Sequence, residues 1–206
     1  MADTSAWERA YQRLKSDILS GSIPIGPLDI RILGDRLRMS VTPVREALAR
    51  LHAERLVRLA PHQGYVVATA SARRLEHLYE LSSALVHLSL ERASRSRRPT
   101  TGPGRPLLLA GSYASDLTAL LGDIAAAQPN GALAESILSL NDQLYAARRY
   151  EPQLFTGADQ ELAGLITLWA NQNAGDLRLR LRDHHRTRLV RVDAIARLLV
   201  EGSGEA

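Results

Sequence analysis

Cysteine is absent from the 206-residue chain, which excludes disulfide bonds, cysteine-ligated zinc or iron–sulfur centres and a thiol nucleophile. No apolar run approaches the roughly 20 residues that a membrane-spanning helix needs, and the polar N-terminus lacks the pattern of a signal peptide. Apolar residues nevertheless make up 45% of the chain, which is enough to bury a core. These features predict a cytoplasmic protein of one large or two small domains, with no membrane partner.

Lysine is almost absent as well, because Lys15 is the single lysine among 26 basic residues. The formal net charge is +4, and most of the surplus lies in residues 1–70, which carry 10 basic and 7 acidic side chains. A surplus of this size is common on protein surfaces. It therefore gives only weak support for a nucleic-acid partner.

Helical periodicity predicts two helices near the N-terminus. The first should end near Gly21, and Pro24 and Gly26 then indicate a turn. A second, short helix is expected over 28–37. The inward faces are predicted to be Trp7, Tyr11, Leu14 and Ile18 in the first helix and Ile32, Leu33 and Leu37 in the second, with Arg9, Arg13, Lys15 and Asp17 off the first face.

A third helix and a hairpin follow within the next 31 residues. Thr42 suits the N-cap and Pro43 the first helical position, where a missing N–H costs nothing. Two β-prone runs, 56–59 and 65–68, are separated by five residues that end in Gly64, where a positive φ is expected. This order predicts a winged helix-turn-helix over residues 1–70, a module that holds a helix in the major groove of DNA.

The exposed start of the third helix carries the candidate DNA contacts. Arg45 can span the two acceptors of guanine, although Arg45 taken alone is better explained as an ordinary surface arginine, and only the order and spacing of the motif favour the DNA contact. Hydroxyls and N–H groups at a helix start suit phosphate oxygens, and a wing tip with glycine can approach the minor groove. The candidates are Arg45 for bases; Arg31, Arg38, Ser40, Thr42 and Pro43 for the backbone; and His62, Gln63 and Gly64 at the wing.

Residues 71–206 are predicted to form a second, all-α domain, which makes the fold class mainly α. A hinge is expected at 69–75 and a mobile connection at 95–106. Residues 177–182 alternate with period two and could form a strand, but apolar positions from Leu177 to Leu199 favour a helix. The expected helices cover 75–93, 108–127, 131–148, 157–173 and 176–200.

Residues 6–68 resemble the N-terminal domain of GntR-type bacterial transcription regulators. The matching residues are Gly26, Leu28, Leu33, Leu37, Ser40, 42–48, Leu51, Glu54, 56–57 and 64–67. The resemblance implies a dimeric, ligand-controlled regulator that binds a short palindrome in double-stranded DNA. Two positions depart from the family: Val41 replaces a DNA-contacting arginine, and Arg55 replaces a glycine, which should strain the turn into the wing.

The second domain is similar to the effector domain, called FCD, of the FadR-like subfamily. That domain usually binds a metal through an Asp and a His four residues apart and two later His. Asn141 and Tyr145 stand at the first two positions and Val192 at a later one, so this degenerate version is expected to hold no metal and no other cofactor. Ser82 stands where the subfamily has an arginine that grips a carboxylate effector.

An effector site in this domain is therefore expected to differ from that of the subfamily. Its candidate residues are Ser82, Asn141, Tyr145 and Arg148, although helix packing explains Tyr145 equally well. His184 and His185 are adjacent and should point in different directions, so both are interpreted as ordinary surface or core residues rather than ligands.

Three functions remain to be compared. The first is a DNA-binding regulator, expected to be a repressor, that dimerises through its helical domain and is gated by a small molecule. The second is a ligand-independent regulator whose helical domain serves only dimerisation or protein interaction. The third is an enzyme, which is not expected because no paired carboxylates, nucleophile elbow, phosphate-binding glycine loop or metal set is evident.

Overall fold

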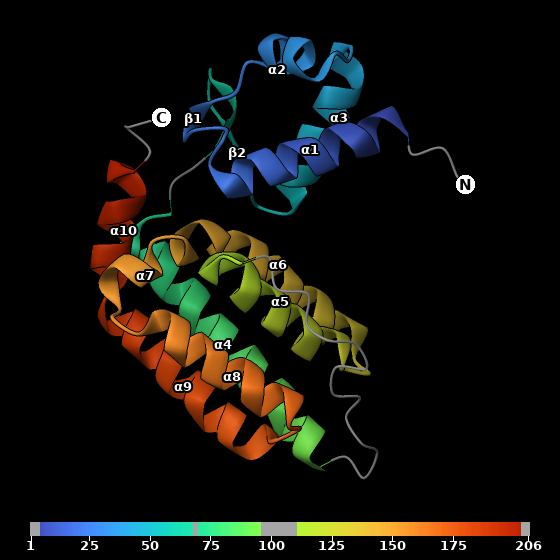
Figure 1. Ribbon diagram of the computed structural model, residues 1–206. Helices are drawn as coiled ribbons and strands as arrows, with labels where there is room; N and C mark the ends of the chain where they lie inside the picture. The colour runs from blue at the N-terminus through green and yellow to red at the C-terminus, as the bar shows by residue number, and fades with distance from the viewer. Residues whose placement is uncertain (1–4, 68–69, 96–110, 203–206) are drawn as a thin grey trace. The chain divides into compact units, whose positions relative to one another are not determined.

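The computed structural model describes residues 5–67, 70–95 and 111–202. Ten helices and three short strands lie within these ranges (Figure 1). Contacts divide the chain near residue 70, so that helices α1 to α3 and the sheet belong to one unit and Ala70–Leu199 form the other. The predicted fold class, a winged helix-turn-helix followed by an all-α bundle, is confirmed.

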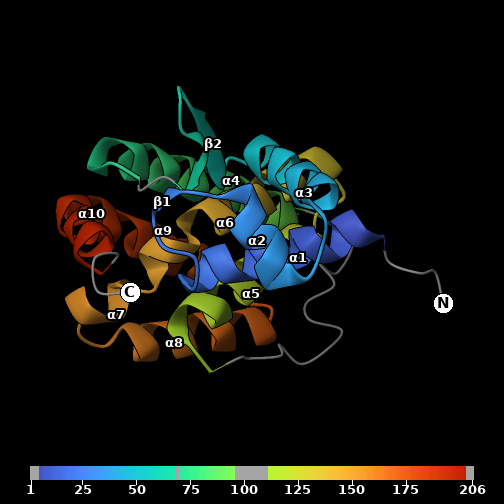
Figure 2. The ribbon, with the colours of Figure 1, turned by 90° about the horizontal axis from the view of Figure 1, so that it is seen from above.

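The first unit contains three helices and a three-stranded antiparallel sheet in the order β1-β3-β2. In Figure 2 the hairpin that contains β2 extends away from the three helices. Strand β1 is a short edge strand and was not predicted, because two residues show no periodicity and Pro27 is tolerated only at an edge. The elements are α1 (Ala6–Ser20), β1 (Gly26–Pro27), α2 (Ile30–Leu37), α3 (Val41–Ala53), β2 (Val57–Ala60) and β3 (Gly64–Val67).

Helix α1 has a capping signal at each end. Ser5 and Glu8 form a reciprocal capping box, and Gly21 ends the helix with φ 80, a left-handed conformation that glycine adopts without strain. The predicted end of the helix near Gly21 is thus confirmed. The core that joins α1 to the other elements consists of Ala10, Leu14, Ile18, Ile23, Leu28, Leu33, Val44, Ala47, Leu48, Leu51, Val57 and Val67.

Three predicted side-chain orientations in this unit are wrong. Trp7, expected on the inward face of α1, is 37% exposed, because it lies in the first turn of the helix, beyond the buried positions that begin at Ala10. Ile32 is 65% exposed, because α2 has only eight residues and buries Leu33 and Gly34. Asp17, expected outside, is buried because Arg13 and Arg36 hold its carboxylate at 3.3 and 3.0 Å. Hydrophobic periodicity predicts neither which side chains a very short helix buries nor that a paired carboxylate is buried.

The second unit is a helical bundle in which α4 packs against α5, α6 and α9 (Figure 1). Its apolar core has two parts, one centred on α5 and α8 and the other where α6 and α10 meet the start of α4. The helices are α4 (Ala72–Arg95), α5 (Tyr113–Ala126), α6 (Gly131–Arg148), α7 (Glu151–Leu154), α8 (Ala158–Ala170), α9 (Ala174–Val190) and α10 (Val192–Glu201).

Several boundaries in this unit differ from the prediction. Helix α4 begins at Ala72, inside the expected hinge, α5 begins at Tyr113 rather than at 108, and α8 ends at Ala170 rather than at 173. The four-residue helix α7 lies between two expected helices and was not predicted. The last predicted helix is divided at Arg191 into α9 and α10, and no proline or glycine marks that point. The strand alternative for 177–182 is excluded by α9, whereas most of the expected connection at 95–106 lies outside the described residues.

Within the described ranges, none of the helices combines the length and the apolar character that crossing a membrane requires.

Candidate nucleic-acid interface and buried ion network

The turn between α2 and α3 sets the start of the candidate recognition helix. Arg38 adopts φ 55, and the N–H of Met39 donates to the carbonyl of Gly34 at 2.9 Å. A Cβ on Gly34 would lie 2.9 Å from the carbonyl oxygen of Met39, so the tight turn requires glycine there. The chain therefore enters α3 in a fixed direction.

Helix α3 begins two residues earlier than predicted. Its N-cap is Ser40 rather than Thr42, and Pro43 is the third helical residue. Pro43 is accepted there because the first four N–H groups of a helix have no partner within it. Ser40 makes no side-chain capping bond, so its hydroxyl and the N–H groups of Val41 and Thr42 stay available to an outside acceptor.

The predicted base-reading residue lies on the exposed side of α3. Arg45 is exposed, whereas Val44, Ala47 and Leu48 beside it are fully buried. Ser40 and Thr42 are also exposed, Pro43 is half-buried, and Arg31 and Arg38 are exposed on and after α2. The six residues that were predicted to contact the bases or the phosphate backbone of DNA therefore lie on one helix–turn–helix. Their contact with DNA stays a prediction.

The wing tip is exposed at His62, Gln63 and Gly64. Gly64 has φ 70, which confirms the expected positive φ, and His62 also has a positive φ of 61. The second value was not predicted, because only a few per cent of non-glycine residues adopt a positive φ, even though histidine is enriched among them. Two left-handed residues within three positions turn the chain sharply between β2 and β3.

A polar cluster behind α3 fixes the end of that helix to α1. The Tyr11 hydroxyl donates to Glu54 at 2.8 Å, and Lys15 Nζ and Arg50 Nε donate to the same carboxylate at 3.1 and 2.9 Å. Partial burial opposes ionisation of Glu54, but the hydrogen bonds from Tyr11 and Lys15 outweigh it and lower its pKa. The cluster holds the candidate recognition helix in place from its protected side.

The turn from α3 into the wing is strained at Arg55, as expected. Its φ is 64, while its N–H donates to the His52 carbonyl and that of Leu56 to the Leu51 carbonyl, at 2.9 and 3.0 Å. This pair of bonds is the Schellman motif, whose left-handed residue is usually glycine. A side chain with a Cβ costs roughly 1–2 kcal/mol in that conformation.

Replacing Arg55 by glycine should therefore raise the free energy of unfolding of the first unit by about 1 kcal/mol, after allowance for the greater freedom of glycine in the unfolded chain. Urea denaturation of the full chain would measure it. Arg58→Gly, in strand β2, is the matched control and should lower stability by about 0.5–1 kcal/mol. A loss of stability in both variants would contradict the assignment of strain to Arg55.

The effector candidates in the second unit do not all meet. Arg148 Nη1 donates to Asn141 Oδ1 and to Thr118 Oγ1, both at 3.0 Å, and Asn141 Nδ2 donates to the Thr118 carbonyl at 3.3 Å. Ser82 is buried elsewhere, 3.2 Å from His185 Nε2, and Tyr145 is half-buried. Asn141 and Arg148 therefore form one buried pair, to which Ser82 and Tyr145 contribute no hydrogen bond.

The residues around Asn141 do not fit a metal ion. The Oδ1 atom that would face the metal accepts a hydrogen bond from the Arg148 guanidinium, and this fixed cation would repel a second one. No three His, Asp or Glu side chains come together as a possible metal site anywhere in the part of the chain that the structure describes. An amide beside a guanidinium is a poor substitute for a carboxylate ligand.

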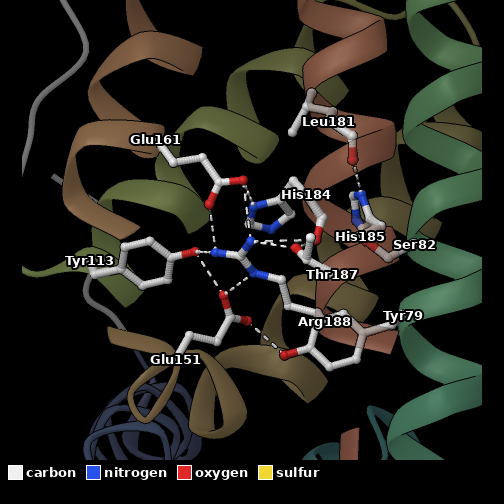
Figure 3. A network of polar contacts seen from close by, with 10 residues as sticks. All are labelled: Tyr79, Ser82, Tyr113, Glu151, Glu161, Leu181, His184, His185, Thr187 and Arg188. Carbon is white, nitrogen blue, oxygen red and sulfur yellow. Dashed lines mark hydrogen bonds and ion pairs between the residues drawn. The ribbon is translucent and has the colours of Figure 1, made fainter. Parts of the chain in front are cut away.

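A larger ion network occupies the interior of the same unit (Figure 3). Arg188 Nε donates to Glu151 at 2.9 Å, and Arg188 Nη2 donates to Glu161 at 2.7 Å and to the Tyr113 hydroxyl at 2.9 Å. The Tyr79 hydroxyl donates to the other oxygen of Glu151 at 2.6 Å. The side chains of Arg188 and Glu151 are 2% and 0% exposed, so this is a fully desolvated ion pair.

The network brings together two carboxylates of the helical half that spacing along the sequence did not pair. Glu151 and Glu161 come from α7 and α8 and converge on one guanidinium. Burial opposes ionisation of both, but His184 and Arg188 lower the pKa of each, that of Glu161 to about 2. Two charged carboxylates therefore face Arg188, and the centroid of the Phe155 ring lies 4.4 Å from its guanidinium carbon.

Both histidines of α9 are buried core residues. His185 Nδ1 lies 2.7 Å from the Leu181 carbonyl and Nε2 lies 3.2 Å from the Ser82 hydroxyl. Only a neutral ring with the proton on Nδ1 can donate to the first and accept from the second. Burial, followed by the neighbouring His184, lowers the pKa of His185 to about 3, and burial also lowers the pKa of His184.

The chain is similar to known regulators, most clearly in its first unit. Residues 6–67 match the family described as "Bacterial regulatory proteins, gntR family". The transcriptional repressor GlaR of Escherichia coli is 37% identical over 87 residues, which cover 40% of each chain. The regulator McbR of the same organism is 36% identical over 83 residues, or 38% of each chain. The matches thus span about two fifths of these relatives.

Solved structures extend the likeness to the whole fold. A transcriptional regulator GntR from Rhodococcus sp. RHA1 has a TM-score of 0.72 at 17% identity and covers 90% of this chain and 96% of its own. Escherichia coli McbR/YncC has a TM-score of 0.62 at 20% identity, with 92% and 98% covered. Residues 6–67 therefore form a winged helix-turn-helix domain of the gntR family, on a chain whose two units together share the fold of these proteins.

Proposed function

We propose that the chain is a sequence-specific, DNA-binding transcription regulator, acting as a repressor and as a dimer on a short palindrome. The observation that carries the proposal is the exposed start of α3, where Arg45, Ser40 and Thr42 project from a helix anchored by buried leucines. The gntR match of residues 6–67 and the named functions of the relatives support the same function. Such a regulator would work in the cytoplasm.

In this proposal each group has a defined role on DNA. Arg45 reads guanine through two parallel hydrogen bonds. Ser40, Thr42 and the free N–H groups at the start of α3 hold phosphates, together with Arg31 and Arg38. The wing tip contacts the neighbouring minor groove.

A mobility-shift titration with the DNA upstream of the chain's own gene tests the proposal, at about physiological salt and with scrambled competitor. We expect a discrete shift that survives the competitor. If no discrete shift forms with the wild type, the same titration with Val41→Arg separates a weakened DNA-binding surface from a wrong assignment. Absence of a shift in both proteins would reject the proposed function.

Arg45→Ala should weaken binding to the specific site by about 1–3 kcal/mol and relax the base preference. Arg38→Ala should weaken all sequences alike and reduce the salt dependence by about one phosphate contact. Fluorescence anisotropy with specific and scrambled duplexes at several salt concentrations measures both effects. Arg186→Ala, an exposed arginine of the second unit, is the control. Unchanged sequence preference in Arg45→Ala would show that another residue reads the bases.

The second unit is proposed to sense a small molecule through Asn141, Arg148, Ser82 and Tyr145. Arg148 supports this idea: it is 1% exposed, its guanidinium donates to the neutral side chains of Asn141 and Thr118, and burying a cation is costly. The alternative is a unit that only dimerises, which the densely bonded Arg188 network favours. A thermal-shift screen against metabolites separates them, because repeated silence with intact DNA binding supports the alternative.

A further inference from the structure

Val41 is an apolar side chain at the exposed start of α3 that has no place in the core. It is the first helical residue and is half-buried, between the exposed Ser40 and Thr42. The apolar contacts at this end of the helix come from its neighbours instead, because Met39 and Val44 both belong to the core of the first unit. Within the described part of that unit Val41 is not a member of the core. Part of its isopropyl group is therefore open to a contact from outside the chain.

Val41 shares one row of α3 with the predicted base-reading residue. Val41, Arg45 and Ala49 follow one another at intervals of four, and Arg45 and Ala49 are exposed. Residues four apart are neighbours on the surface of a helix, and helical side chains lean toward the N-terminus. Val41 therefore lies beside Arg45, on the side of the helix tip. The N-terminal residues of a recognition helix are those that contact base edges.

Valine can recognise one kind of group on a base edge. Its side chain neither donates nor accepts hydrogen bonds, and the apolar group that bases present in the major groove is the C5 methyl of thymine. Against cytosine or adenine it would displace water from an amino group without replacing the hydrogen bond, which is costly. A phosphate needs a donor, which the exposed hydroxyls of Ser40 and Thr42 can supply on either side.

We propose that Val41 is a specificity-determining residue that reads a thymine through its C5 methyl, next to the guanine read by Arg45. Four residues of helix span about 6 Å and neighbouring base pairs are about 3.4 Å apart. The thymine therefore lies within about two base pairs of that guanine. The proposal rests on the proposed function and adds to it a base preference that Arg45 alone does not provide.

The first test removes only the methyl group from the DNA. Selection from a random duplex library with the full chain gives the preferred half-site, and each thymine in it is then replaced by deoxyuridine, one at a time. Base pairing is unchanged by this replacement. At one thymine within two base pairs of the guanine, affinity should fall about fourfold, the factor expected for losing one buried methyl. Fluorescence anisotropy measures it, and no loss at any such thymine would overturn the proposal.

The second test assigns the methyl contact to Val41. Val41→Ala should weaken binding to the thymine duplex about fourfold and should bind the thymine and deoxyuridine duplexes equally well. Val41→Ile should keep the preference for thymine. Val190→Ala is the matched control, because Val190 is a 78% exposed valine of the second unit, and it should keep the wild-type preference.

The ratio of the two affinities separates base reading from a structural role. If Val41 only supported the fold of α3, Val41→Ala would lose affinity for both duplexes equally and would keep the wild-type ratio. That result would overturn the proposal. Circular dichroism of each variant confirms that the helices are intact.

The same measurements distinguish failure of this proposal from failure of the proposed function. If the wild type selects no sequence from the library, sequence-specific regulation is rejected, and the reading of thymine is rejected with it. If the wild type selects a half-site but Val41→Ala still prefers thymine to deoxyuridine, the proposed function stands and only the role of Val41 is wrong.

Discussion

Replacing Arg188 by leucine is expected to lower the free energy of unfolding of the second unit by about 3–5 kcal/mol. The substitution leaves Glu151 fully buried without the cation that contacts it, and it also removes the guanidinium that Glu161 and Tyr113 share. An uncompensated charge in the interior costs more than the ion pair contributes, because its desolvation is no longer offset. The loss should therefore exceed that of an ordinary surface substitution several times over.

Thermal and urea unfolding of the full chain, followed by circular dichroism, would measure this loss. Arg186→Leu lies on the same helix and removes only an exposed pair with Asp183 at 3.2 Å, so it should change stability by less than about 1 kcal/mol. Adding Glu151→Leu to Arg188→Leu should recover part of the loss, since the stranded charge disappears. Equal stability of Arg188→Leu and Arg186→Leu would refute a structural role for the network.

Acidification is expected to destabilise the second unit between about pH 6.5 and pH 3. Burial, reinforced by His184, lowers the pKa of His185 from 6.5 in the unfolded chain to about 3 in the folded one. The unfolded state therefore binds a proton first as the pH falls, and stability is lost from pH 6.5 downward. The loss from this residue is about 1 kcal/mol for each pH unit until the folded-state pKa is reached.

Two other groups, His184 and Glu161, also make the folded state less stable as the pH falls. Burial also lowers the pKa of His184. The stability that this residue contributes is therefore also lost as the pH falls below 6.5, the pKa of histidine in the unfolded chain. Glu161 has its pKa lowered to about 2, chiefly by His184 and Arg188 against partial burial. Its contribution is present above pH 4.5 and is lost as the pH falls from 4.5 toward 2.

The free energy of urea unfolding, measured at intervals from pH 7 to pH 4, would test the histidine contribution. His185→Leu should reduce the slope of stability against pH over this range, even though it lowers stability at neutral pH by leaving the Ser82 hydroxyl without its acceptor. His62→Gln at the exposed wing tip should leave the slope unchanged. If the wild type, His185→Leu and His62→Gln all lose stability with the same dependence on pH, His185 is not the cause of the acid sensitivity.

The first unit could be predicted from sequence because its signals are local. Gly21, Pro43 and Gly64 mark turns or helix starts within a few residues of where the structure has them, and the apolar residues of α1 and α3 recur at helical spacing. The errors fall where local signals are weak. Strand β1 has two residues, and a proline within the first turn fits several positions, so the start of α3 was misplaced.

The helices of the second unit could largely be predicted from sequence, but the buried network around Arg188 could not. Helical spacing located α6 and favoured α9 over a strand, whereas α7 has only four residues and follows no period. Glu151, Glu161 and Arg188 lie in three different helices. Their meeting depends on how those helices pack, and no spacing along the chain encodes that. Asn141 and Arg148 were both predicted as effector candidates, and these two residues of α6 do form a hydrogen bond.

The distances along the chain that Arg188 bridges have a consequence for the lifetime of the folded state. Tyr113 is 75 residues and Glu151 is 37 residues from Arg188, so the cluster closes only after most of the bundle has assembled. Contacts that form after the folding transition state slow unfolding and leave the folding rate almost unchanged. The cluster therefore acts chiefly on how long the bundle, once formed, resists opening and proteolysis.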